Sequence, residues 1–85
     1  MLQTVDTTTR IREWVLGNFP AAQEQGIGPG DSLFDTGIVD SLGVLEIVMF
    51  LETEFGVAAL DDDMVPDHFE SIEAIAQFVG RKIAA

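Results

Sequence analysis

Apolar residues recur at helical spacing in three long segments of the chain, which cover residues 7–18, 41–55 and 71–83. Within each segment they fall three, four and seven positions apart, so they share one face of a helix. No alternation of apolar and polar residues competes with this pattern, and strands are therefore not expected. The side chains predicted to face a core are Ile11, Trp14, Val15, Phe19, Val44, Ile47, Val48, Leu51, Phe55, Ile72, Ile75, Ala76, Val79 and Ile83.

Local signals mark where these helices begin and end. Asp6 or Thr7 is suited to cap the first helix, because its side-chain oxygen can accept a hydrogen bond from a free backbone N–H. Pro20 prevents that helix from continuing. Gly56 is suited to end the second helix in a left-handed conformation, and Ser71 is suited to cap the last one.

Two connections complete the predicted fold. Residues 21–39 contain four glycines and one proline and indicate a long loop, whereas residues 64–68 indicate a short helical turn that begins near Pro66. The apolar side chains expected to hold the loop against the core are Leu33, Phe34, Ile38 and Val39. The prediction is an all-α four-helix bundle with a short third helix and a long ordered loop between the first two helices. It forms a single domain over residues 1–85.

The charge of the chain limits the classes of partner and site that it can have. Its 85 residues include 15 acidic and 4 basic side chains, for a formal net charge of −11, and no cysteine. This excludes nucleic acid as an electrostatic partner, and it leaves neither disulfides nor thiolate zinc sites. Residues 13–80 carry 14 acidic side chains and no lysine or arginine. Ion pairs within the chain therefore cannot be the purpose of these charges. The acidic groups should repel one another, and basic proteins are the expected partners.

Nothing in the sequence predicts secretion or insertion into a membrane. The first ten residues are polar and rich in threonine, unlike a signal peptide. The longest uninterrupted apolar run, residues 47–51, is too short to cross a bilayer. We therefore expect a cytoplasmic monomer that does not associate with membranes.

The second helix is predicted to have two apolar faces. Beside the core stripe, a second patch is formed by Leu42, Leu45 and Met49. Either the helix is buried on most of its circumference, or this patch is exposed. Glu46 and Glu52 border the patch on both sides, and an unpaired carboxylate is costly to bury. We therefore favour an exposed apolar patch with an acidic rim, which is typical of a protein-docking surface. Phe50 fits neither face.

The triplet Asp-Ser-Leu occurs twice. Its first copy follows Gly30, so that residues 30–33 resemble the block that names a family of serine esterases. Such an enzyme needs a histidine base oriented by an aspartate, on a much larger α/β scaffold. The one histidine is His68, and the residue three positions before it is Val65 rather than an aspartate. The esterase interpretation is therefore rejected.

The second copy of the triplet, residues 40–42, opens the long second helix. Backbone N–H groups and the positive end of the helix dipole point toward Ser41, so a phosphodiester on its oxygen would be favourably placed. Taken alone, an aspartate and a serine at this place are more often a simple helix cap.

Residues 37–42 read Gly-Ile-Val-Asp-Ser-Leu, and residues 45–48 and 51–56 follow them. Together these segments resemble the phosphopantetheine attachment region of acyl carrier proteins. Residues 31–37 resemble the loop that leads into the site in this family. Residues 66–72 resemble the turn between its third and fourth helices. Three blocks in register make the resemblance specific, and it extends from the first predicted helix into the last.

The resemblance implies a four-helix carrier domain in which Ser41 bears a 4′-phosphopantetheine arm, whose thiol holds a substrate as a thioester. The protein would not be an enzyme. It has no base near Ser41 and no cysteine, so a separate phosphopantetheinyl transferase would attach the arm. Asp40 would help to position the magnesium ion used in attachment, and the chain itself would hold no metal. Enzymes that load, condense or transfer acyl groups would dock through basic surfaces. The docking residues implied are Leu42, Leu45, Glu46, Met49 and Glu52.

Two positions depart from the pattern of fatty-acid carriers, which often have acidic residues where this chain has Gly43 and Thr53. We therefore expect a stand-alone acyl carrier protein that holds acyl or ketide intermediates in a specialised, polyketide-type pathway. An aminoacyl or peptidyl carrier of a nonribosomal peptide pathway uses the same thioester chemistry and stays an alternative. From another class, an acidic helical module would bind proteins through the second patch without a cofactor.

Three further features are assigned no chemistry. The three consecutive aspartates at positions 61–63 lack the spacing of a calcium loop and are expected to be solvated. His68 alone cannot form a metal site, and Trp14 is expected to pack in the core.

Overall fold

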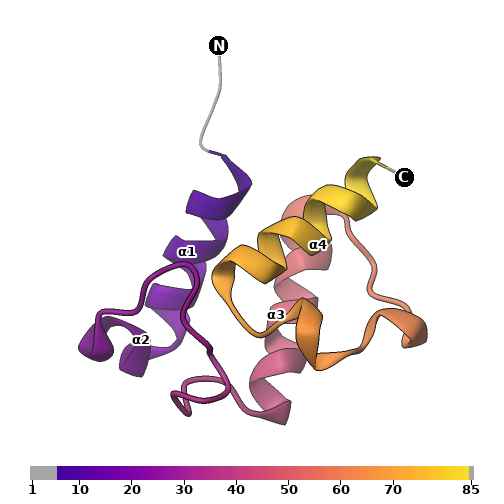
Figure 1. Cartoon of the computed structure of the whole chain (residues 1–85). Coiled ribbons are helices and arrows are strands. Elements are labelled where there is room, and N and C mark those ends of the chain that lie inside the picture. Colours follow the sequence, from indigo (N-terminus) through magenta and orange to yellow (C-terminus); the bar gives the residue numbers. More distant parts are fainter. Residues whose placement is uncertain (1–5, 85) are drawn as a thin grey trace.

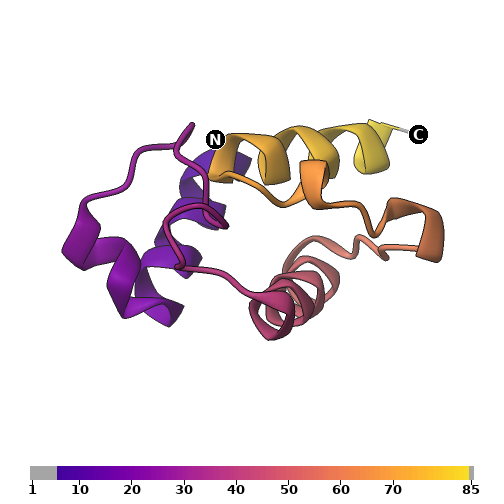
Figure 2. The same ribbon diagram turned by 60° about the horizontal axis from the view of Figure 1, so that its bottom comes forward.

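The computed structural model describes residues 6–84, and this part of the chain is helical, with no strand. The all-α prediction is therefore confirmed. None of the helices in this part is long and apolar enough to span a membrane. α4 crosses α3 with α1 beside them (Figure 1), and the turned view shows α3 and α4 on opposite sides of the molecule (Figure 2). The α-helices are α1 (Thr7–Asn18), α2 (Pro20–Gln25), α3 (Ser41–Phe55) and α4 (Ile72–Ala84), and the two 3-10 turns are η1 (Asp61–Asp63) and η2 (Pro66–His68).

α1, α3 and α4 match the three predicted long helices to within one residue at each end, and each is capped by a side chain just before it. The side chains of Asp6, Asp40 and Ser71 accept hydrogen bonds from the backbone N–H three residues further on, at 2.9, 2.9 and 3.0 Å. Gly56 ends α3 in a left-handed conformation, with φ of 68°. These local bonds fix where each helix starts and therefore place the serine that begins α3.

The connection predicted over residues 21–39 is partly helical. Pro20 ends α1 as expected, but it also begins α2, because its fixed φ and missing N–H suit the first turn of a helix. Gly26, with φ of 61°, ends α2, and the remainder of the connection has neither helix nor strand. The short third helix predicted over residues 64–68 is the 3-10 turn η2, and η1 is a further turn ahead of it.

The core lies between α1, α3, α4 and the loop before α3. Phe69 and Phe78 are its largest fully buried side chains, although neither lies on a predicted stripe. Phe78 follows Ile75 by three residues, so the buried face of α4 is wider than the stripe. Ile83 is predicted to be buried but is 59% exposed, in the last turn of α4. Trp14 is half-buried. The other fully buried large side chains are Ile11, Val15, Leu33, Ile47, Leu51, Ile72, Ile75 and Val79.

Main-chain hydrogen bonds fix the loop before α3 to the rest of the fold. The N–H of Leu33 donates to the carbonyl of Glu70 at 2.6 Å, and the N–H of Glu73 donates to the carbonyl of Pro29 at 2.9 Å. Of the four apolar side chains predicted to anchor this loop, three are buried and Phe34 is half-buried. The loop is therefore ordered, as predicted, and it delivers the chain to the first turn of α3.

Gly43, in the first turn of α3, is a packing position. A Cβ atom there would lie 3.0 Å from Cγ1 of Val39 and 3.3 Å from Cε1 of Phe19. Its missing side chain lets the first turn of α3 approach the end of α1 closely. The beginning of α3 is thus held by packing as well as by its cap.

Within residues 6–84, two ion pairs join the ends of the chain to its acidic middle. Arg10 of α1 pairs with Glu54 of α3, and Lys82 of α4 pairs with Asp63 of η1 at 2.7 Å. The partners are far apart in sequence, and the fold brings them together because Arg10 of α1 lies beside α3 and Lys82 of α4 lies beside η1. A tally of charges along the chain does not contain this information.

Candidate functional site

Ser41 is the first residue of α3, and its side chain is exposed. Asp40 precedes it, and its Oδ1 accepts a hydrogen bond of 2.9 Å from the N–H of Gly43. The free N–H groups and the dipole of α3 make this end of the helix electropositive, in a protein with a net charge of −11. The Ser41 hydroxyl can therefore be reached from outside, and an anionic group attached to its oxygen is favoured there.

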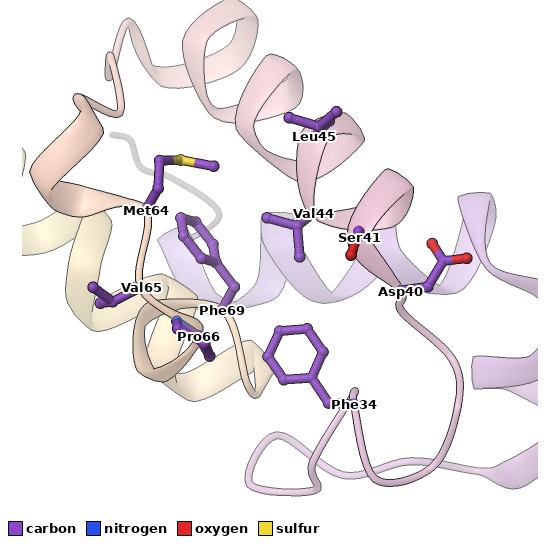
Figure 3. Close-up of a pocket in the computed structure, with 9 residues that line it drawn as sticks. All are labelled: Phe34, Asp40, Ser41, Val44, Leu45, Met64, Val65, Pro66 and Phe69. Atoms are coloured by element: carbon purple, nitrogen blue, oxygen red, sulfur yellow. The ribbon is translucent and has the colours of Figure 1, made fainter.

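An apolar pocket of about 470 Å³ lies beside Ser41. Figure 3 shows Val44 and Leu45 of α3 on one side of it and Met64 on the segment between η1 and η2 on the other. Its lining consists of Phe34, Val44, Leu45, Met64, Val65, Pro66 and Phe69, with Asp40 and Ser41 at its polar edge. An apolar chain attached at Ser41 therefore has a matching surface within reach.

The wall of the pocket that faces α3 is the part of the site that sequence reasoning missed. Met64 and Val65 are 38% and 40% exposed, and they follow η1 in a segment without helical periodicity. Phe69, which has no place on a predicted stripe, is buried behind them. The signal in the sequence is a group of apolar side chains between two helices that the helical stripes do not account for.

The second apolar face of α3 is exposed, so the alternative in which α3 is buried on most of its circumference is wrong. Leu42, Leu45 and Met49 are 70%, 53% and 67% exposed. Glu46 and Glu52 are also exposed, and within residues 6–84 no basic side chain pairs with either. We call these five residues the α3 patch.

Within residues 6–84 no three potential metal ligands are grouped, and the three consecutive aspartates have different surroundings. The first two are exposed. Asp63 instead accepts hydrogen bonds from Nζ of Lys82 at 2.7 Å and from the N–H of Leu60 at 3.0 Å. These bonds, that of Lys82 foremost, lower the pKa of Asp63 below its ordinary value. Nδ1 of His68 lies 2.8 Å from the carbonyl oxygen of Asp63, so the histidine also helps to hold this segment.

Ser32, in the first Asp-Ser-Leu triplet, has a structural role. Its Oγ accepts a hydrogen bond from the N–H of Asp35 at 3.0 Å, and its carbonyl accepts one from the hydroxyl of Thr36 at 2.8 Å. These bonds close a turn in the loop before α3. The two serines thus differ in environment, because Ser32 is bonded within a turn whereas Ser41 is exposed at the start of a helix.

The chain is similar in sequence to known proteins. Residues 9–79 match the family model described as a phosphopantetheine attachment site. Acyl carrier protein 2 of Pseudomonas aeruginosa is 38% identical over 74 residues, which cover 87% of this chain and 86% of that protein. Such proteins are non-catalytic carriers with a covalently attached 4′-phosphopantetheine, served by a phosphopantetheinyl transferase and by biosynthetic enzymes. The exposed hydroxyl and the adjoining pocket fit that group. The chain therefore belongs to the acyl carrier protein family of phosphopantetheine-binding carriers.

Proposed function

We propose that 4′-phosphopantetheine is attached to Ser41 and that the protein is a stand-alone carrier of acyl or ketide intermediates. The observation that carries this proposal is the exposed Ser41 hydroxyl at the first position of α3, beside an apolar pocket. The phosphodiester would lie at the electropositive start of the helix. When bound, the arm supplies the thiol that this cysteine-free chain lacks.

The lining of the pocket supports an acyl or ketide cargo. Its side chains are almost all apolar, and they favour an aliphatic chain over a charged aminoacyl group, which would lose hydration there. Gly43 and Thr53 support a specialised pathway rather than fatty-acid synthesis. At Gly43 an acidic side chain would require Val39 and Phe19 to shift.

The α3 patch is the surface on which we expect partner enzymes to dock. Its exposed apolar centre and acidic rim complement an enzyme surface on which lysine and arginine surround an apolar site. The partners expected are the phosphopantetheinyl transferase and the enzymes that load, condense or transfer acyl groups.

Attachment to Ser41 is tested by the intact mass of the protein after incubation with coenzyme A and a broad-specificity phosphopantetheinyl transferase. The unmodified protein should gain the mass of one phosphopantetheine, and Ser41→Ala should gain none. Ser32→Ala is the matched control, because it removes the hydroxyl of the other Asp-Ser-Leu triplet, and it should be modified normally. No gain in the wild type, or a gain that survives in Ser41→Ala, contradicts the proposal.

The same reaction tests whether Asp40 helps to position the magnesium ion used in attachment. Its carboxylate is exposed and caps α3, so two variants separate the two tasks. Asp40→Asn keeps a good cap but removes the charge, whereas Asp40→Ala removes both and should lose about 1 kcal/mol of stability. We expect Asp40→Asn to melt like the wild type and to be modified more slowly at limiting Mg²⁺. Modification at the wild-type rate in limiting Mg²⁺ contradicts this role.

A further inference from the structure

A row of aromatic side chains joins α1 to α3 and accounts for Phe50, which fits neither predicted face. The ring of Phe50 stacks on that of Trp14, with centroids 4.5 Å apart and 13° between the planes. Phe55 meets Phe50 edge-on, with centroids 5.7 Å apart. All three side chains are half-buried, so part of the row reaches the surface.

One end of this row already holds an arginine from the chain itself. The guanidinium of Arg10 lies 4.8 Å from the centroid of the Phe55 ring, and it pairs with the carboxylate of Glu54. A guanidinium is planar, so it can stack on a ring and donate to a carboxylate at the same time. An aromatic ring with a neighbouring carboxylate is therefore an arginine site in this protein.

Beyond Trp14 the row continues edge-on to Phe19, with centroids 5.7 Å apart. Beside Trp14 and Phe50 the same combination of ring and carboxylate occurs without a cation. A groove of about 330 Å³ is lined by Trp14, Glu46, Met49, Phe50 and Thr53. Within residues 6–84 no lysine or arginine pairs with Glu46 or lies over either ring. The groove thus offers two stacked rings and a carboxylate that no basic side chain of this part of the chain occupies.

We propose that this groove receives an arginine side chain of a partner enzyme. The guanidinium would lie over the part of the Trp14 ring that neither Phe50 nor Phe19 covers and pair with Glu46, and the methylene stem would cover Met49. The inference takes the nature of the partner from the proposed carrier function. It extends the surface used in docking from the α3 patch across to α1.

Charge complementarity selects this occupant over the others. The chain has a net charge of −11, and Glu46 stands at the groove, so a cationic side chain is attracted there and an anionic one is repelled. A second copy of the chain would bring the same acidic surface to the groove. Lysine fits less well than arginine, because its compact ammonium lacks the planar face that stacks on a ring.

Trp14 is the single tryptophan and allows a direct test. Protein labelled with 5-fluorotryptophan gives one fluorine resonance, which is followed while N-acetyl-arginine methylamide is added. We expect a saturable shift with this probe, a smaller one with N-acetyl-lysine methylamide and none with N-acetyl-norleucine methylamide. Equal shifts with the arginine and norleucine probes, or no shift with any probe, would overturn the proposal. A shift on concentrating the protein alone would also overturn it, in favour of a second copy.

Two matched variants test the carboxylate. Glu46→Gln and Glu52→Gln each remove one exposed charge from α3, but only Glu46 lines the groove. Glu46→Gln should weaken arginine binding by about threefold, as expected for an exposed pair, and Glu52→Gln should leave it unchanged. Equal effects of the two variants contradict the site. This titration does not involve Ser41, so it can fail while attachment succeeds, or succeed while attachment fails.

Discussion

At the scale of single residues, Asp63 ties the wall of the pocket to α4. Its carboxylate binds Nζ of Lys82 and the N–H of Leu60, and both hydrogen bonds lower its pKa. Because the pKa is lower in the folded state than in the unfolded state, the ionised carboxylate stabilises the fold above the unfolded pKa. That contribution is lost as the pH falls through the folded pKa.

Lys82→Met should therefore lower the free energy of unfolding at pH 7 and have less effect at an acidic pH below the lowered pKa of Asp63, where the carboxylate is protonated. Urea unfolding at both pH values measures the difference. Arg81→Met is the matched control, because it removes the same charge from the same turn, and Arg81 forms no ion pair within residues 6–84. Equal losses in the two variants at pH 7 would show that the bond to Asp63 has no specific effect.

At the scale of helices, the elements that could be predicted are those whose signals are local. Asp6, Ser71 and Gly56 mark ends of α1, α4 and α3 through bonds within a few residues. α2 could not be predicted, because Pro20 is equally suited to stop one helix and to start the next.

The candidate site divides in the same way. Ser41 and the α3 patch follow from one helix and its spacing, and so the sequence suffices to place them. The far wall of the pocket, with Met64 and Phe69, depends on how a segment without periodicity folds back against α3. The groove at Trp14 depends on how α1 and α3 pack against each other, and the apolar pattern of one helix does not show this.

Gly43 in α3 and Gly80 in α4 allow the effect of helix propensity on stability to be distinguished from the effect of packing. Alanine favours a helix over glycine by up to about 1 kcal/mol. At Gly80 a Cβ atom meets nothing within 4 Å, so Gly80→Ala should raise the free energy of unfolding. At Gly43 it would press on Val39 and Phe19, so Gly43→Ala should gain less or be destabilising. Chemical unfolding of both variants measures the difference, and an equal gain would contradict the close packing of α3 on the end of α1.

At the scale of the whole molecule, acidic side chains outnumber basic ones by 15 to 4. Two of the basic residues are used in the ion pairs of Arg10 and Lys82, both at the edges of the acidic middle. The remaining carboxylates repel one another, which opposes folding and at the same time attracts basic partners.

Millimolar Mg²⁺ should therefore raise the melting temperature by screening this repulsion. A gain of about 1 kcal/mol would appear as a rise of roughly 4–8 °C in a domain of this size. Thermal unfolding followed by circular dichroism measures it, with sodium chloride at matched ionic strength as the control for screening alone. An unchanged or lower melting temperature in Mg²⁺ would contradict the picture of a fold limited by its own charge.

Ser41 and the pocket wall opposite it are fastened by separate sets of contacts. The serine is set by the cap and packing of α3, whereas Met64 and Val65 lie on a segment bonded to α4 through Asp63. Replacements in that segment can widen or narrow the space without disturbing the serine. Sequence changes there can therefore alter which cargo the pocket accepts while the proposed attachment point keeps its geometry.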